Sequence, residues 1–212
     1  MIQFEEFKKI PRLFRECTIT EKIDGTNGQI VIQPSILGAE VNNAPLAAET
    51  VDGVEYYVWA GSRNRWVYPG GSRDNSGWAQ WVSDRAAGLI EVLGEGRHYG
   101  EFWGAGIQRK YGLTNGDKRF SLFNTSKWLP VLRERETKGW GIPAGLGVVP
   151  VMYEGPFVTR EVEDQIFRLR TFGSLCVPGF MDAEGVVVYH HAAGSYFKVT
   201  VKDDEKPKGS RE

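Results

Sequence analysis

The chain has 212 residues, which allows one large domain or two small ones with a substantial core. Its composition is that of an ordinary globular protein, with 41% hydrophobic and 25% charged residues. The formal net charge of −1 argues against a dedicated nucleic-acid coat protein. No apolar run reaches the roughly 18 residues that cross a membrane, and the N-terminus lacks the basic start of a signal peptide. We therefore expect a cytoplasmic protein that has no membrane partner and keeps Cys17 and Cys176 as free thiols.

The N-terminal half favours strands. Strand-like stretches lie on either side of a polar break at 24–28, and alternating residues predict a strand through 29–33. Residues 34–53 carry Pro, Gly, Asn and acidic residues, a composition typical of a surface excursion, that is, a loop on the outside of the fold. A second strong strand is expected over 54–62.

The pattern then changes to a helical period over 76–93, and Gly94 follows as a stop signal. Two further strands are expected at 98–104 and 119–124. Residues 139–147 are expected to have no regular secondary structure. The sequence so far predicts an α+β fold dominated by antiparallel strands.

The C-terminal part predicts a strand over 147–155, a short helix over 159–172, and a closing strand pair at 183–191 and 195–202. The tail 203–212 is charged and lacks apolar residues, so we expect it to be flexible. No internal repeat is visible, and a single domain over 1–202 is the expectation.

The sequence Lys-Ile-Asp-Gly-Thr-Asn at 22–27 follows the first strand. A lysine there is a candidate covalent nucleophile if neighbouring cations or desolvation favour its neutral amine. Gly25 is expected to take a backbone conformation open to few other residues, so that the chain can turn tightly beside a phosphate. Alone, this short pattern equally suits an ordinary turn at the end of a strand.

Further motifs follow in a fixed order: Gly-Ser-Arg-Asn at 61–64, Tyr-Gly-Glu-Phe-Trp-Gly at 99–104, Phe-Ser-Leu-Phe-Asn at 120–124, Glu-Gly-Val-Val-Val at 184–188 and Phe-Lys-Val-Thr at 197–200. This order resembles the motif set of the covalent nucleotidyltransferases, which include ATP-dependent DNA ligases, RNA ligases and capping enzymes. Because Thr26 and Asn27 follow the lysine motif and GAGIQRKYG follows the Glu101 motif, the chain looks most like RNA ligases of the second bacteriophage type. The resemblance implies the nucleotidyltransferase domain of that superfamily, an ATP-grasp-like adenylylation fold.

The resemblance implies a cofactor site. Lys22 would attack the α-phosphate of ATP, and its neighbours Glu21 and Ile23 would line the nucleotide. Glu101 would accept hydrogen bonds from the ribose hydroxyls, Phe123 would stack on adenine, and Arg63 would contact the nucleotide or the end phosphate. Taken singly, the last three also suit a strand-end acid, a core phenylalanine and a loop charge.

The resemblance also implies a catalytic metal and phosphate site. Glu184, with Asp24 assisting, would hold Mg²⁺ or Mn²⁺ together with phosphates and waters. Lys198 would contact the α-phosphate, offset developing charge and favour the neutral amine of Lys22.

Four residues would touch the nucleic acid: Asn27, Arg63, Arg109 and Lys202. Many relatives carry two lysines in their last motif, whereas this chain has Thr200 at the second position, with Lys202 two residues further on. Only about a dozen residues follow Lys198, so neither an OB fold nor a helical C-terminal domain is expected.

The resulting hypothesis is a minimal, monomeric, ATP-dependent RNA ligase of RNA repair that joins 5′-phosphate and 3′-hydroxyl ends through lysyl-AMP. A bacteriophage or bacterial source would suit it. The alternatives are a minimal DNA ligase with the same site, a nucleic-acid end-binding module with a vestigial site, and, less favoured, a capping-type guanylyltransferase. No residue in the sequence can be recognised as a contact to the 2′-hydroxyl of RNA, so the preference for RNA depends on the resemblance.

Overall fold

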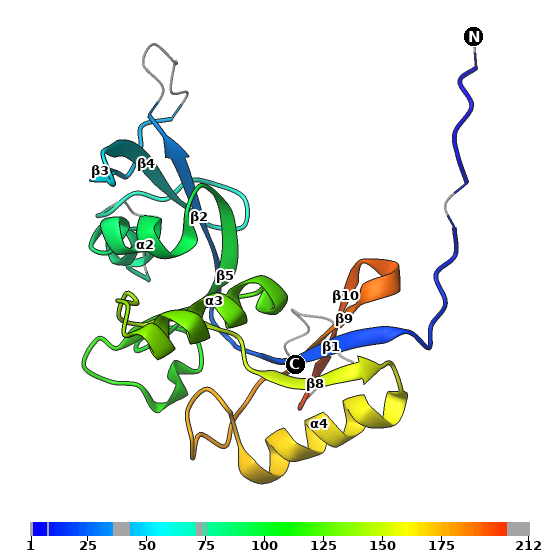
Figure 1. The fold of residues 1–212 in the computed structure, drawn as a ribbon. Coiled ribbons are helices and arrows are strands. Elements are labelled where there is room, and N and C mark those ends of the chain that lie inside the picture. Colours follow the sequence, from blue (N-terminus) through cyan, green and yellow to red (C-terminus); the bar gives the residue numbers. More distant parts are fainter. Residues whose placement is uncertain (1, 8, 36–42, 71–73, 75, 203–212) are drawn as a thin grey trace. The chain divides into compact units, whose positions relative to one another are not determined.

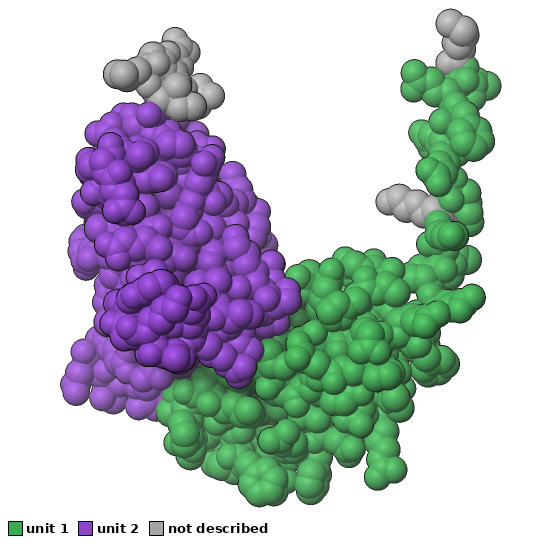
Figure 2. Space-filling view, in the orientation of Figure 1, with its two compact units in different colours: residues 1–22, 150–212 green, residues 23–149 purple. Residues whose placement is uncertain are grey.

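The computed structural model describes residues 2–7, 9–35, 43–70, 74 and 76–202. The chain divides into two compact units, which are described separately (Figure 2). Unit 1 comprises residues 1–22 and 150–212, and unit 2 comprises residues 23–149. The predicted flexible tail at 203–212 lies outside the described residues.

Unit 1 is built on a four-stranded antiparallel sheet whose strand order is β10-β9-β1-β8 (Figure 1). Its strands are β1 (Glu16–Lys22), β8 (Val151–Pro156), β9 (Gly185–His190) and β10 (Ser195–Thr200). The predicted closing strand pair is therefore β9 and β10, joined by a short 3-10 turn at His191–Ala193.

Helix α4 (Thr159–Phe172) covers one face of this sheet. Its apolar residues recur at helical spacing, so that they line one side of the helix and pack on alternate residues of the strands. The shared core contains Cys17, Ile19, Val162, Ile166, Leu169, Ala183, Val186 and Val188. The other face of the sheet consequently carries the remaining residues of each strand, Lys22 among them.

Unit 2 contains a six-stranded sheet in the order β3-β4-β2-β5-β6-β7. All its strand pairs are antiparallel except β6 with β7, which is parallel. The strands are β2 (Thr26–Pro34), β3 (Ala47–Val51), β4 (Val54–Gly61), β5 (Gly96–Gly104), β6 (Lys118–Leu122) and β7 (Leu146–Val148).

The helices of unit 2 are α1 (Trp78–Ser83), α2 (Ala86–Leu93) and α3 (Thr125–Lys138), with a 3-10 turn at Lys110–Gly112. They pack on one face of the sheet and enclose an aromatic core. Trp78 contacts Phe102 and Phe120 at ring-centroid distances of 4.9 and 4.6 Å. Because this face is filled, the opposite face carries the polar residues discussed below.

The predicted α+β class with largely antiparallel sheets is confirmed, but three local expectations were wrong and one helix was missed. The predicted helix over 76–93 is two helices, because Arg85 leaves helical geometry (φ −122°, ψ 8°). The predicted strand over 147–155 is split into β7 and β8, the supposed surface excursion contains β3, and α3 was not predicted at all. Among the described residues no helix is both long and apolar enough to span a membrane.

Candidate active site

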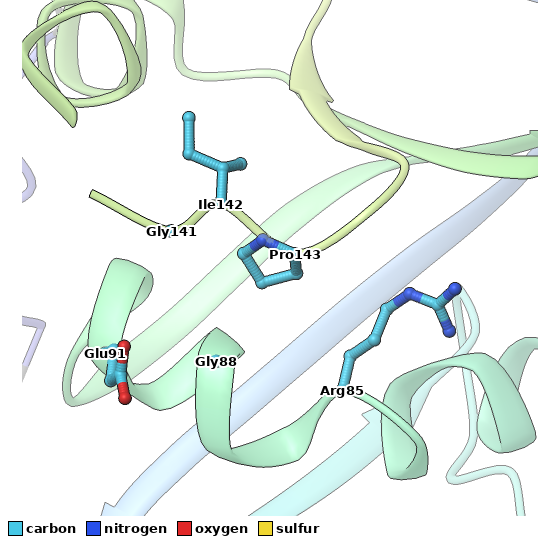
Figure 3. Close-up of a pocket in the computed structure, with 6 residues that line it drawn as sticks. All are labelled: Arg85, Gly88, Glu91, Gly141, Ile142 and Pro143. Atoms are coloured by element: carbon cyan, nitrogen blue, oxygen red, sulfur yellow. The ribbon is translucent and has the colours of Figure 1, made fainter. Parts of the chain in front are cut away.

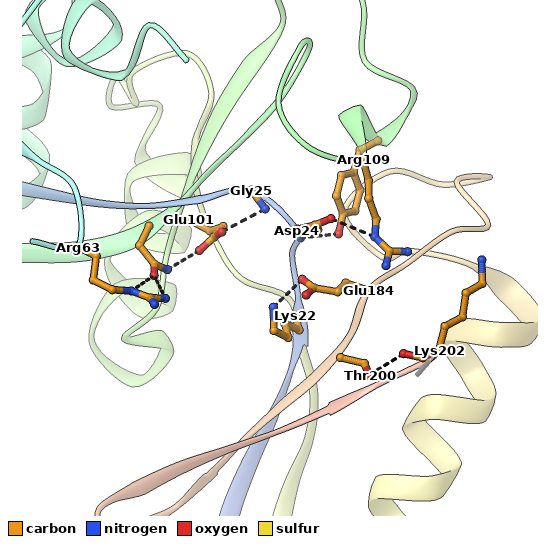
Figure 4. A network of polar contacts seen from close by, with 11 residues as sticks. Lys22, Asp24, Gly25, Arg63, Glu101, Arg109, Glu184, Thr200 and Lys202 are labelled. Atoms are coloured by element: carbon orange, nitrogen blue, oxygen red, sulfur yellow. Dashed lines mark hydrogen bonds and ion pairs between the residues drawn. The ribbon is translucent and has the colours of Figure 1, made fainter. Parts of the chain in front are cut away.

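Lys22 is the last residue of β1 and lies opposite Gly185, the first residue of β9. Its Nζ is 2.6 Å from Oε2 of Glu184, the residue just before that strand (Figure 4). Both groups are largely withdrawn from solvent, with side-chain exposures of 19% for Lys22 and 7% for Glu184. The register of two neighbouring strands thus brings together two predicted site residues that are far apart in the sequence.

Glu184 Oε2 is buried and accepts no hydrogen bond of acceptable geometry, although it forms the ion pair with Lys22. A carboxylate oxygen has room for more than one partner, and buried oxygens are usually satisfied. This oxygen therefore has acceptor capacity for another cation or donor beside the lysine.

Lys198 lies on the same sheet face as Lys22. On β9, Val186 and Val188 point into the core with α4, so Val187 points to the opposite face. Val187 lies between Lys198 of β10 and Thr20 of β1, so these three residues share one face. Lys22 is two residues after Thr20 on β1 and therefore lies on the same face. The exposed Lys198 is thus on the same face as Lys22, two residues before Thr200, which lies across β9 from Lys22.

Lys202 has a different setting from Lys198. It follows the end of β10, and its Nζ forms a 2.6 Å ion pair with Asp182 Oδ1. Its carbonyl oxygen accepts a hydrogen bond from Thr200 Oγ1 at 2.8 Å (Figure 4). Within unit 1, Lys202 is thus held by an acidic partner at the surface.

The side chain of Glu21 points into unit 1, away from the Lys22 face. Its carboxylate accepts hydrogen bonds from Ser174 Oγ at 2.5 Å, from the Leu175 amide at 2.8 Å and from the Cys176 amide at 3.3 Å. Burial raises the pKa of Glu21, and these hydrogen bonds oppose part of that rise. Sequence reasoning expected a cofactor contact, whereas the carboxylate itself anchors the 174–176 loop to β1.

In unit 2, four predicted motif residues form one polar cluster. Glu101 on β5 faces Asn27 on β2, and its Oε2 accepts from Asn27 Nδ2 at 2.8 Å. Its Oε1 accepts from the Gly25 amide at 3.1 Å. Arg63 in turn donates to Asn27 Oδ1, from Nε at 3.0 Å (Figure 4). The cluster ties the turn after Lys22 to the sheet of unit 2.

Gly25 is needed in this cluster for a reason other than the predicted one. Its φ is not among the positive values, so the expectation of an unusual backbone conformation was wrong. A Cβ at this position would instead clash with the carbonyl oxygen of Phe102 and lie 2.9 Å from Cβ of Trp103. Glycine therefore permits close approach of the turn to β5.

Asp24 is held by a loop with unusual backbone geometry. Arg109 Nε lies 3.1 Å from Asp24 Oδ2, and the Asp24 amide donates to the hydroxyl of Tyr111 at 2.9 Å. Gln108, Lys110 and Tyr111 have φ values of 43°, 61° and 50°, in the region that non-glycine residues rarely adopt. Backbone strain of this kind persists only where surrounding contacts enforce it and is common at functional sites.

Sequence reasoning missed Tyr111, although it lies within the GAGIQRKYG segment. The ring is fully buried and packs edge-on against Trp103 at 5.1 Å. Nothing in the spacing of the segment reveals that its hydroxyl reaches the Asp24 backbone, because that contact depends on the loop conformation.

The two remaining predicted cofactor residues differ in exposure. Ile23 is buried, with a relative exposure of 4%. Phe123 is exposed, and its amide donates to Tyr99 O at 3.0 Å, beside β5. By strand alternation Phe123 lies on the same sheet face as Glu101, because Glu101 pairs with Ser121.

A hollow of about 260 Å³ lies elsewhere in unit 2 (Figure 3). It is lined by Arg85, Gly88, Glu91, Gly141, Ile142 and Pro143. None of the predicted site residues lines it, and it holds no cluster of nucleophilic or metal-binding groups. In the part of the chain that the structure describes, no group of three His, Cys, Asp or Glu residues could hold a metal by itself.

The family model described as RNA ligase matches residues 15–200. The chain therefore belongs to the RNA ligase family. None of the curated proteins compared with it matches.

Solved structures share the fold. A mutant of the Naegleria gruberi RNA ligase with ATP and Mn has a TM-score of 0.51 at 14% identity, over 90% of this chain and 51% of that one. A second mutant of that ligase, also with ATP and Mn, has a TM-score of 0.50 at 16% identity, over 89% and 50% of the two chains. An archaeal ATP-dependent RNA ligase has a TM-score of 0.47 at 19% identity, over 93% and 48%. The chain thus spans about half the length of these ligases.

Proposed function

We propose that residues 1–202 form the nucleotidyltransferase domain of an ATP-dependent RNA ligase that works through a lysyl-AMP at Lys22. The observation that carries this proposal is the Lys22–Glu184 pair, in a chain of the RNA ligase family. The ATP and Mn in the Naegleria ligase structures support ATP, with Mn²⁺ or Mg²⁺, as the cofactors here.

In the first step the neutral amine of Lys22 attacks the α-phosphorus of ATP. The N–P bond forms as the P–O bond to pyrophosphate breaks, and the amine gives up a proton. Lys198, on the same face of the unit 1 sheet, would stabilise the charge on the phosphate oxygens. AMP then passes to a 5′-phosphate end, and a 3′-hydroxyl displaces AMP to seal the strand.

The residues near Lys22 fit a divalent cation. Glu184 Oε2 is buried with unused acceptor capacity, which a hard cation can fill. Because no three-residue cage exists among the described residues, phosphate oxygens and waters would complete the coordination. A cation bound there would draw the carboxylate away from Lys22 and so favour the neutral amine. Asp24 of unit 2 remains a second candidate ligand.

In unit 2 we assign Glu101 to the ribose hydroxyls, Phe123 to the adenine face and Arg63 to a phosphate. The exposed ring of Phe123 and the carboxylate of Glu101 share one sheet face, which supports this assignment. Asn27, Arg109 and Lys202 remain the candidate contacts to nucleic acid.

The substrate we propose is RNA with 5′-phosphate and 3′-hydroxyl ends. Thr26 and Asn27 after the lysine motif, together with the GAGIQRKYG segment, support the second bacteriophage type within the family. The two free cysteines suit a reducing compartment, and we propose a cytoplasmic monomer that serves RNA repair.

The test is transfer of label from α-labelled ATP to the polypeptide in the presence of Mg²⁺ or Mn²⁺. We expect acid-labile label on the wild type, none on Lys22→Ala, and unchanged label on the matched control Lys138→Ala, an exposed lysine on α3. Bound AMP should first be removed with pyrophosphate. No label on the folded wild type would overturn the proposal.

Substrate choice is tested separately with nicked duplexes that differ only in RNA or DNA on the 3′-hydroxyl side. Preferential sealing of the RNA-containing nick is the expected result. Equal sealing of both would overturn the RNA preference while leaving the lysyl-AMP chemistry in place.

A further inference from the structure

The sheet face of unit 1 that carries Lys22 and Lys198 continues into a cluster of aromatic rings. Tyr189 on β9 pairs directly with Tyr196 on β10, and Thr18 on β1 pairs with Tyr189 from the other side. Tyr189 follows the core residue Val188 and Tyr196 lies directly opposite Tyr189, so both tyrosines point to the face opposite α4.

The rings of this cluster lie close together. The centroids of Tyr189 and Tyr196 are 4.6 Å apart, and His191 of the turn between the strands lies 5.1 Å from Tyr189. His191 Nε2 is also 3.0 Å from Thr18 Oγ1. Although its neighbours hold it, Tyr196 remains 65% exposed. An exposed ring that packs on a second ring offers a flat apolar surface at little further entropic cost.

We propose that Tyr196, backed by Tyr189 and His191, forms a stacking platform for a nucleobase of the polynucleotide substrate. This inference rests on the proposed function, and it names a contact that none of the sequence motifs includes. Successive bases of single strands stack on exposed aromatic side chains, and basic residues follow the phosphates.

The charges around the platform favour a polyanion on the β10 side. Lys198 is exposed on the same face, two residues from Tyr196 on β10. Partial burial, and secondarily the nearby Tyr189, raise the pKa of Tyr196, so its phenol stays neutral and does not repel phosphates. On β8, the exposed Glu154 pairs with Thr18 of β1, and its negative charge disfavours phosphates at that edge of the sheet.

The distance from Tyr196 to Lys22 favours a base of the polynucleotide, rather than the adenine of ATP, as the group that stacks on Tyr196. The row of Tyr196 lies four residues from the row that contains Lys22 and Thr200, about 13 Å along the sheet. Stacked nucleotides of one strand advance about 3.4 Å each, so this span corresponds to about four nucleotides. The base of an AMP attached to Lys22 is only one ribose away from its phosphate.

The test compares Tyr196→Ala with Phe197→Ala. Phe197 is the ideal control because it is the next residue on β10 and is 57% exposed, but it points to the other face of the sheet. Tyr196→Phe keeps the ring and removes only the hydroxyl. The full chain of each variant is titrated with a short 5′-phosphorylated RNA that carries the fluorescent base 2-aminopurine near its 5′ end.

We expect Tyr196→Ala to weaken RNA binding about tenfold and to abolish the quenching of 2-aminopurine that stacking produces. Tyr196→Phe should restore both, and Phe197→Ala should leave both within about twofold of the wild type, since it loses no stacking surface on that face. Equal effects of Tyr196→Ala and Phe197→Ala, or wild-type binding by Tyr196→Ala, would overturn the platform.

Labelling with α-labelled ATP separates this proposal from the ATP site and from the proposed function. Tyr196→Ala should form lysyl-AMP at the wild-type rate, since the platform serves the polynucleotide. Loss of labelling in step with RNA binding would overturn the assignment and make the ring an ATP contact. If the wild type takes no label at all, the proposed function fails, while RNA binding and quenching still decide the platform.

Discussion

Glu101 in unit 2 and Glu184 in unit 1 are both buried glutamates of the candidate site, but their carboxylates have different partners. In unit 2, both oxygens of Glu101 accept hydrogen bonds, one from the Gly25 amide and one from Asn27. In unit 1, Glu184 Oε2 lies against Lys22 without a well-formed hydrogen bond. The first carboxylate is part of a completed network, and the second has acceptor capacity left.

The difference indicates that Glu101 has a structural role and that Glu184 is available for chemistry. A satisfied buried network fixes the geometry of the groups it joins, and removing one acceptor leaves its donors without partners. A buried carboxylate with one ionic partner can exchange that partner for another cation at little cost to the fold. We therefore expect substitutions at Glu184 to affect chemistry and substitutions at Glu101 to affect stability as well.

The largest predicted effect is that of Glu184→Gln on lysyl-AMP formation. The amide has the same shape but cannot offer a negative charge to Lys22 or to a divalent cation. We expect the rate of labelling from ATP to fall by roughly 10²–10³-fold, the range for loss of one electrostatic contact in an active site. The melting temperature should change far less than the rate, because the amide oxygen of glutamine can still accept a hydrogen bond from Lys22 Nζ although the ion pair is lost.

Glu163→Gln on the exposed side of α4 is the matched control in unit 1 and should retain full labelling. If Glu184→Gln labels as fast as this control, the contrast between the two glutamates is wrong. A large loss of unit 1 stability in Glu184→Gln would also contradict it.

The second predicted effect is the destabilisation of unit 2 by Glu101→Gln. One end of the glutamine amide is a donor and would face either the Gly25 amide or Asn27 Nδ2, both of which are donors. One unsatisfied buried donor costs about 1–3 kcal/mol, so the melting temperature should fall by roughly 3–10 °C.

Tryptophan fluorescence reports this transition specifically. All seven tryptophans lie in unit 2: Trp59, Trp66, Trp78, Trp81, Trp103, Trp128 and Trp140. Glu95→Gln, at an exposed position before β5, should melt like the wild type. An unchanged transition in Glu101→Gln would show that the network around Gly25 is not stabilising.

The contrast between the units also bears on what the sequence could predict. The sequence pattern located β9 and β10, and the helical period located α4 with its observed ends; for β9 and α4 the pattern is set by one buried face. Helix α3 was missed because it contains Pro130 and buries few residues, so its period is weak. Strand β3 was missed because its short sequence lies between turn-forming residues.

The site shows the same limit. The motifs identify Lys22 and Glu184 as site residues, but their contact depends on the register of β1 with β9. The sequence does not reveal that register. The reason for Gly25 and the role of Tyr111 depend on how closely two backbone segments approach each other. Such contacts are properties of packing, and no periodicity encodes them.

The smallest predicted effect is an opposite pH dependence of the two units. Burial lowers the pKa of His98 in unit 2 below its ordinary 6.5, so the unfolded chain binds the proton more tightly there. The stability that neutral His98 gives is complete above pH 6.5 and is lost as the pH falls from there through the lower pKa of the folded state. Burial raises the pKa of Glu21 in unit 1 above its ordinary 4.5, so its contribution is complete below pH 4.5 and is lost as the pH rises.

Between pH 6.5 and 4.5, acidification should therefore weaken unit 2 and strengthen unit 1. Urea unfolding followed by tryptophan fluorescence should give a lower midpoint for unit 2 at the acidic end of this range, and His98→Gln should flatten that slope. Hydrogen exchange of peptides from β9 and β10 should show the reverse trend for unit 1, and Glu21→Gln should remove it. Because a shared global transition would give both probes the same pH dependence, parallel trends would mean that the two units unfold as one and that neither buried group dominates its own unit.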